Sequence, residues 1–213
     1  MVDRIFLLTG AAEIPVLSRF LTRPGMEIAV QAVSTADDLA YAASARSTAR
    51  TRLVAFSTNV MVPPEVLKIC TNGAFNFHPG PPEVPGVHTG AFALYEGLDT
   101  FGVTAHLMTE RPDAGPIFAV ERFPVTPDIN RETLEIETYT ALARLFMTMA
   151  PQLANLDYIF TPLALERWSK RLRTFKQYDR LRCINDNLDA EELTRRRRAF
   201  AGDLIEESGV QND

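Results

Sequence analysis

Asn76 and His78 are the residues of this chain whose types and spacing are best suited to chemistry. They end a short apolar run that begins at Gly73, and Pro79 follows them. Side chains two apart in a strand point to the same face, so we expect the amide and the imidazole side by side. The carboxyl ends of strands border the ligand crevice of open parallel sheets. The pair therefore marks a candidate site, although a buried Asn and His bonded only to the backbone are the structural alternative.

The elements that must position this pair follow an alternating order. Short apolar runs that end at Gly or Pro predict strands, and amphipathic or capped segments predict helices. The first half is expected to hold strands at 4–9, 26–33, 52–57 and 73–77 and helices at 35–44 and 63–70. A helix at 90–96, strands at 102–108 and 117–123, an amphipathic helix at 133–153 and an exposed helix at 189–206 follow. This alternation predicts an α/β fold with an open, Rossmann-like, mostly parallel sheet and flanking helices.

Composition excludes several classes of protein. The 213 residues carry a formal net charge of −5, which disfavours binding of nucleic acid over the whole surface. No apolar stretch approaches the roughly 20 residues that span a bilayer, and the run Ile5 to Leu8 is too short for a secretion signal, so we expect a cytoplasmic protein. Cys70 and Cys183 lie far apart and match no metal-ligand spacing, so we expect reduced thiols and no metal.

The charge is unevenly distributed along the chain. Residues 166–198 contain 11 Lys and Arg against 6 Asp and Glu, half of all basic residues. We therefore expect a main domain at 1–160 and a basic, mostly helical C-terminal extension at 161–213. Within it, Trp168 to Arg182 mixes basic and aromatic residues and could bind a phosphorylated ligand or dock a partner subunit. The run Arg195 to Arg198 has acidic neighbours, which favours a solvated helix face over a nucleic-acid patch.

A second signal, an acidic loop further along the chain, makes the pattern specific. The segment Phe101 to His106 precedes the loop that contains Asp113 and Gly115. The Asn-x-His-Pro segment, the small-residue helix, the Gly-Val-Thr strand and the Asp-x-Gly loop, in this order, resemble the catalytic domain of folate-dependent formyltransferases. That family includes glycinamide ribonucleotide, methionyl-tRNA and sugar N-formyltransferases and formyltetrahydrofolate hydrolases. The resemblance covers roughly residues 1–155.

The resemblance implies a catalytic triad of Asn76, His78 and Asp113 that moves a formyl group from 10-formyltetrahydrofolate to an amine. Attack on a formyl carbon creates an oxyanion, which the Asn76 amide and a protonated His78 could stabilise by donating hydrogen bonds. Asp113 would raise the basicity of the imidazole, orient its ring and help to move the proton of the acceptor. No metal is required.

The resemblance also implies where the two substrates bind. Folate is expected at Met61 and Val62, ahead of the Asn-x-His strand, and at Thr109, Glu110 and Arg111, ahead of Asp113. For the apolar pair, burial in the core is the alternative explanation. Pro81, Gly86 and His88 are expected at the acceptor, and His106 is interpreted as a structural histidine.

The identity of the acceptor stays open at this level. The segment after His78 reads Pro-Gly-Pro-Pro-Glu-Val-Pro-Gly, where many members of the family have His-Pro-Ser followed by leucines. We expect a small amine, for which a nucleotide-linked amino sugar is one candidate, rather than nucleic acid. The alternatives are a hydrolase that releases formate and a non-catalytic folate-binding or scaffold protein. A homodimer is compatible with the sequence.

Overall fold

A six-stranded sheet forms the centre of the computed structural model, which describes residues 3–22, 28–45 and 49–206. Its strands are β1 (Asp3–Leu8), β2 (Ile28–Val33), β3 (Thr51–Phe56), β4 (Ala74–His78), β5 (Thr100–Leu107) and β6 (Ile117–Pro124). They lie in the order β2-β1-β3-β4-β5-β6. The first four are parallel, whereas β5 is antiparallel to both β4 and β6. The short β5–β6 loop requires that reversal, because a parallel neighbour needs a long crossover. The mostly parallel α/β fold is thus confirmed.

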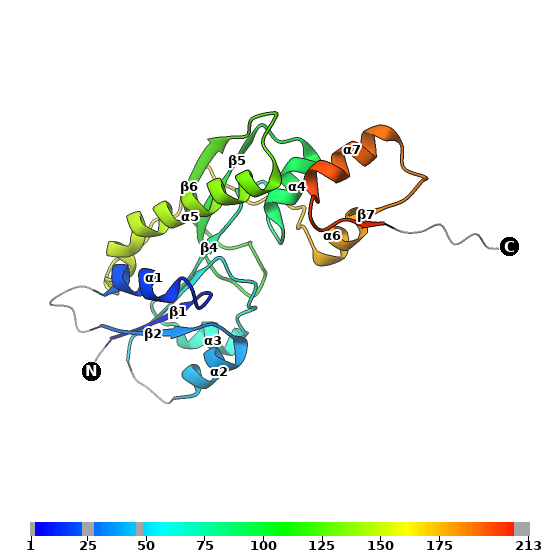
Figure 1. Ribbon diagram of the computed structural model, residues 1–213. Helices are drawn as coiled ribbons and strands as arrows, with labels where there is room; N and C mark the ends of the chain where they lie inside the picture. Colours follow the sequence, from blue (N-terminus) through cyan, green and yellow to red (C-terminus); the bar gives the residue numbers. More distant parts are fainter. Residues whose placement is uncertain (1–2, 23–27, 46–48, 207–213) are drawn as a thin grey trace.

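Helices α1 (Ile14–Leu21) and α5 (Arg131–Leu153) cover one face of the sheet (Figure 1). Leu142 and Phe146 of α5 are buried against Phe56 and Phe77 of the strands. The amphipathic pattern predicted this helix from residue 133, and it begins two residues earlier. Its start follows from capping, because the Asn130 side chain accepts a hydrogen bond from the backbone N–H of residue 133 at 2.8 Å.

Helices α2 (Ala36–Ser44) and α3 (Pro64–Ile69) cover the opposite face near β1 and β3. Leu39 and Val66 pack there against Phe6 and Leu53. The strand predicted at 26–33 appears as Ile28–Val33, and residues 26 and 27 lie outside the described residues. The two faces of the sheet are therefore both buried, as parallel strands require.

The remaining elements gather at one end of the molecule, on the right in Figure 1. They are α4 (Thr89–Glu96), α6 (Phe175–Leu181), β7 (Cys183–Ile184), α7 (Ala190–Ala199) and β8 (Ile205–Glu206). Phe92, Tyr178 and Phe200 are buried together there. The helix predicted at 189–206 ends at residue 199, because the chain turns at 201–203 and then pairs as β8.

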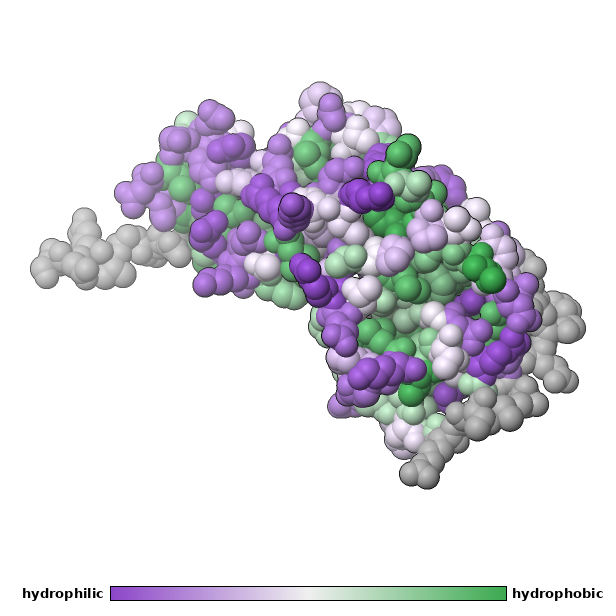
Figure 2. Space-filling view, turned by 180° about the vertical axis from the view of Figure 1, so that it is seen from behind, coloured by the Kyte–Doolittle hydropathy of each residue, from purple (hydrophilic) through white to green (hydrophobic). Residues whose placement is uncertain are grey.

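The basic run of α7 is engaged in local ion pairs. Arg195 and Arg196 both contact Glu192, which also accepts a hydrogen bond from the Tyr95 hydroxyl of α4. This arrangement agrees with the predicted solvated helix face. Figure 2 shows the same end of the molecule, at the upper left, as a mostly hydrophilic surface.

The C-terminal segment returns to the sheet after α5. Arg173 forms a bridge with Gly86, and its buried guanidinium pairs with Glu96 at 2.6 Å. A domain boundary near residue 160 stays a prediction, but residues beyond it build part of the central cavity described below. Among the described residues, none of the helices combines the length and the apolar character needed to cross a bilayer.

Candidate active site

The end of β4 presents the predicted pair of side chains. Asn76 and His78 lie on one face of this strand, while Phe75 and Phe77 are buried in the core on the other. The antiparallel register of β5 places His106 directly opposite Asn76. Residues opposite each other in such a pair have neighbouring side chains. The Nδ2 atom of Asn76 and the Nε2 atom of His106 are accordingly 3.2 Å apart.

Asp113 reaches the same place from the loop between β5 and β6. Its Oδ2 atom lies 3.6 Å from His78 Nδ1, and its Oδ1 atom lies 3.3 Å from His106 Nε2. The backbone N–H of Gly86 donates to Oδ2 at 2.8 Å. The backbone of Asp113 is left-handed, with a φ of 41°. A left-handed backbone at a residue other than glycine is strained, and such residues are concentrated at functional sites. Here the surrounding contacts hold Asp113 in this conformation.

Two glycines allow the chain segments around this carboxylate to approach closely. Gly86 has a φ of 108°, and a side chain there would lie 2.0 Å from the carbonyl oxygen of Arg173. A side chain at Gly115 would lie 1.9 Å from the carbonyl oxygen of Leu107. Neither position has room for another residue type, so both glycines are needed to bring the Asp113 loop to the histidines.

The protonation states follow from burial and from the neighbouring charges. Burial would raise the pKa of Asp113, but His78, His106 and the Gly86 amide hold it at about 2. Burial lowers the pKa of His78 below its ordinary value, and the attraction of Asp113 only partly opposes this. The carboxylate is therefore ionised and His78 neutral at pH 7. The protonated His78 expected from the sequence at the oxyanion stage stays a prediction, and this proton would have to be acquired during the reaction.

His78 is nevertheless prepared to receive a proton. Its Nδ1 atom faces Asp113 and its Nε2 atom lies 3.3 Å from the carbonyl oxygen of Val84. Both ring nitrogens thus face acceptors, and only the imidazolium can donate to both. A proton taken from a reacting group would be stabilised by these two contacts.

A cavity of about 690 Å³ opens beside these groups. All three catalytic candidates line it, and so do the five residues predicted to bind folate, which are Met61, Val62, Thr109, Glu110 and Arg111. Met61 is 64% exposed, so the alternative of core packing is wrong for this residue. The size of the cavity and its mixture of polar and apolar lining residues suit a folate, because ligand pockets usually measure about 300–1,000 Å³. The roles of these residues stay predictions.

The residues predicted at the acceptor divide into two groups. Gly86 and His88 line the cavity, and the His88 ring stacks on Tyr178 with 3.6 Å between ring centroids. Pro81 is buried and is not among the lining residues, so its role at the acceptor stays a prediction. It lies in the rigid loop after His78, where its fixed backbone shapes the loop.

Sequence reasoning missed two contributions to the site. His106 was interpreted as structural, yet it contacts both Asn76 and Asp113. Its place on the same strand face as Thr104 was a signal, but only the pairing with β4 shows what that face meets. The second wall of the cavity comes from α5 and from residues 172–175. The latter lie in the basic and aromatic segment that the sequence singled out, but nothing in the sequence places that segment, or α5, at the cavity. Among the described residues, no group of three or more His, Cys, Asp and Glu side chains could hold a metal ion.

The protonation of His78 predicts how stability depends on pH. A histidine whose pKa is lowered by folding binds fewer protons when folded than when unfolded, so stability falls as the pH drops below about 6.5. The slope is at most about 1.4 kcal/mol per pH unit for each such histidine. Urea unfolding between pH 7.5 and 5.5 should show the loss, and His78→Gln should reduce it. Equal slopes in the wild type and this variant would contradict the assignment.

Comparison with known proteins identifies the family. A family model described as formyl transferase matches residues 29–149, which is more than half of the chain and includes Asn76, His78 and Asp113. The chain belongs to the formyl transferase family. This confirms the resemblance drawn from the Asn-x-His and Asp-x-Gly segments.

Individual relatives of this formyl transferase family member are distant. A methionyl-tRNA formyltransferase of Dictyoglomus thermophilum is 26% identical over 152 residues, which cover 70% of this chain and 47% of the relative. The match thus spans about half the length of that protein.

Two solved structures show the same fold. A sugar N-formyltransferase from Shewanella sp. has a TM-score of 0.76 at 14% identity, covering 97% of this chain and 93% of that one. The formyltransferase PseJ from Anoxybacillus kamchatkensis, solved with UDP-4,6-dideoxy-4-formamido-L-AltNAc and tetrahydrofolate, has a TM-score of 0.67 at 17% identity. That match covers 84% of this chain and 89% of PseJ.

Proposed function

We propose that this protein transfers a formyl group from 10-formyltetrahydrofolate to the amino group of a small acceptor. One observation supports this most strongly. The Asp113 carboxylate lies between two imidazoles, one of which also contacts the Asn76 amide, at the edge of a cavity of about 690 Å³. These are the groups that proton transfer and oxyanion stabilisation require.

The proposed reaction begins when the acceptor nitrogen attacks the formyl carbon. A C–N bond forms, and the carbonyl oxygen becomes an oxyanion that accepts a hydrogen bond from the Asn76 amide. Neutral His78 donates its Nε2–H to the Val84 carbonyl and takes a proton from the attacking nitrogen on Nδ1, and Asp113, 3.6 Å from Nδ1, stabilises the resulting imidazolium. The oxyanion then collapses, the bond from carbon to N10 breaks, and His78 returns the proton to N10. The products are tetrahydrofolate and the formamide of the acceptor.

The second wall of the cavity favours an organic acceptor over water. Tyr139 of α5 and Phe175 of α6 line it and are 45% and 52% exposed. Such surfaces bind carbon skeletons, whereas a hydrolase needs room only for a water molecule.

A nucleotide-linked amino sugar is the acceptor that we propose, and basic side chains near the second wall support it. Lys170 and Lys176 are exposed and lie close in sequence to Leu172 and Phe175, so they are suited to phosphates. The buried Arg173 is not available, because it pairs with Glu96. The sugar nucleotide bound to PseJ, which shares the fold, is consistent with this class.

The proposal is tested by supplying 10-formyltetrahydrofolate with and without a panel of UDP-linked and dTDP-linked amino sugars. We expect tetrahydrofolate to form in proportion to a formylated sugar detected by mass spectrometry, with slow formate release when no amine is present. His78→Ala should abolish both the formation of the formylated sugar and the release of formate. Fast formate release that no amine changes would establish a hydrolase, and folate binding without turnover would establish a binding protein.

A further inference from the structure

Trp168 lies in the segment after α5 and contacts both histidines of the site. Its ring centroid is 4.9 Å from that of His106 and 5.7 Å from that of His78, in edge-to-face arrangements of 80° and 75°. Such geometry is attractive between aromatic rings. Trp168 is not among the residues that line the cavity, so it packs against the imidazoles from outside the cavity.

The same indole is tied to the loop that carries Asp113. Its Nε1–H donates to the carbonyl oxygen of Gly115 at 2.8 Å. Gly115 follows Asp113 by two residues and has no room for a side chain against β5. The indole therefore contacts the two rings and the carboxylate loop at once, and movement of one would disturb the others.

The segment that carries Trp168 is held on the loop that follows His78. The N–H of Ser169 donates to the carbonyl oxygen of Pro82, and the N–H of Arg173 donates to that of Pro85, both at 2.8 Å. Prolines keep this loop rigid. The position of the indole is thus determined by backbone contacts on a rigid support.

We propose that Trp168 is a positioning residue that holds the rings of His78 and His106 in register with the Asp113 loop and keeps water from them. The inference rests on the proposed formyl transfer for its consequence in catalysis. The titratable groups that face His78 are Asp113 and His106, and the Val84 carbonyl meets its Nε2 atom. Burial is the largest cause of the lowered pKa of His78, so a change in the titration of His78 in a Trp168 variant reports a change in its packing and hydration.

Three variants test the proposal. Trp168→Phe keeps a ring but loses the hydrogen bond to Gly115, and kcat should fall about fivefold, as expected for one neutral hydrogen bond. Trp168→Ala also releases both imidazoles, and kcat should fall about 100-fold, the effect of a misplacement of about 1 Å. The control is Leu165→Ala, because Leu165 lies in the same segment and is 95% exposed. It should behave as the wild type, and the donor KM should stay unchanged in all three.

The decisive readout is the titration of His78 followed by NMR. In Trp168→Ala the pKa of His78 should rise toward its ordinary value, because burial is what lowers it. A wild-type kcat and an unchanged titration of His78 in Trp168→Ala would overturn the proposal. A loss of kcat in the Leu165→Ala control as large as that in Trp168→Ala would also overturn it. If Trp168→Ala does not fold, Trp168→Phe carries the test. If the wild type transfers no formyl group, the proposed function fails, whereas the titration still tests the positioning role.

Discussion

The Asp113→Asn variant is expected to lose amine-dependent formyl transfer by about 10²–10⁴-fold, the range of general acid–base catalysis, while it still binds folate. Asn has the same size and tolerates the left-handed backbone at this position, so the loop should keep its shape. Its amide oxygen can still accept from Gly86. The variant lacks the negative charge that stabilises the imidazolium of His78, so proton transfer from the acceptor becomes costly.

Steady-state kinetics and folate titration calorimetry together check this result. The matched control is Asp128→Asn, because Asp128 is an exposed residue in the connection between β6 and α5. It should react at the wild-type rate. A near-wild-type rate in Asp113→Asn would show that the carboxylate has no role in proton transfer. Loss of folate binding would show that its role is to shape the donor site.

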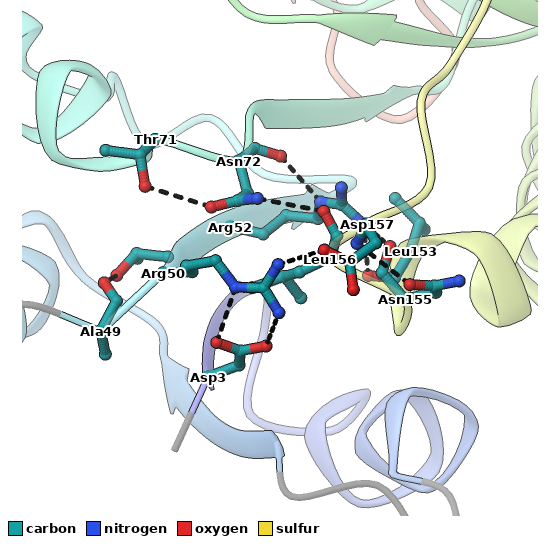
Figure 3. A network of polar contacts seen from close by, with 11 residues as sticks. Asp3, Ala49, Arg50, Arg52, Thr71, Asn72, Leu153, Asn155, Leu156 and Asp157 are labelled. Carbon is teal, nitrogen blue, oxygen red and sulfur yellow. Dashed lines mark hydrogen bonds and ion pairs between the residues drawn. The ribbon is translucent and has the colours of Figure 1, made fainter. Parts of the chain in front are cut away.

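Replacing Arg52 with Leu is expected to lower the free energy of unfolding by about 3–5 kcal/mol. Arg52 is a fully buried residue of β3. Its guanidinium donates to five backbone carbonyl oxygens at 2.7–3.5 Å, those of Asn72, Gln152, Leu153, Asn155 and Tyr158. Figure 3 shows Arg52 beside Asn72, Leu153 and Asn155. Gln152 and Leu153 belong to the last turn of α5, where helix carbonyls lack partners within the helix, and Asn155 and Tyr158 follow it. Leucine would remove a donor from all five oxygens. Those of Gln152 and Asn155 would still accept from backbone N–H groups, so the cost falls mainly on the carbonyls of Asn72, Leu153 and Tyr158.

The charge of Arg52 persists despite its burial. Burial and the neighbouring Arg50 lower the pKa of Arg52 to about 10, so the group is still protonated at neutral pH. A cation at a helix C-terminus also interacts favourably with the helix dipole. Arg52→Lys should therefore recover part of the stability but not all, because one ammonium cannot reach all of these carbonyls.

Arg50 is a natural control in the adjacent part of the chain. It forms ion pairs with Asp3 and Asp157, but its side chain is 45% exposed (Figure 3). Exposed pairs contribute little because water screens them, so Arg50→Gln should change stability much less than Arg52→Leu. Thermal unfolding of the variants should separate them, with a fall of about 10 °C for Arg52→Leu. Similar unfolding midpoints for Arg50→Gln and Arg52→Leu would show that the buried hydrogen bonds of Arg52 contribute no more to stability than the exposed ion pairs of Arg50.

The features that the sequence predicted are those that depend on local periodicity. Asn76 and His78 share a face because strand side chains alternate, and α5 was predicted because its apolar residues recur every three or four positions. The Pro and Gly residues around them set where the elements end. The boundaries of α7 were predicted less well, since its end depends on the turn at 201–203.

What the sequence by itself determined is the α/β order and the pair of polar groups at the end of β4. Only the tertiary structure decided what surrounds that pair. His106 joins it through antiparallel pairing, and Trp168 through a segment some 90 residues away in the chain. Away from the site, only the tertiary structure gives Arg52 its partners at the end of α5. The physical reason is that strand pairing and helix docking are chosen by the burial of whole surfaces, which no local pattern of residues contains.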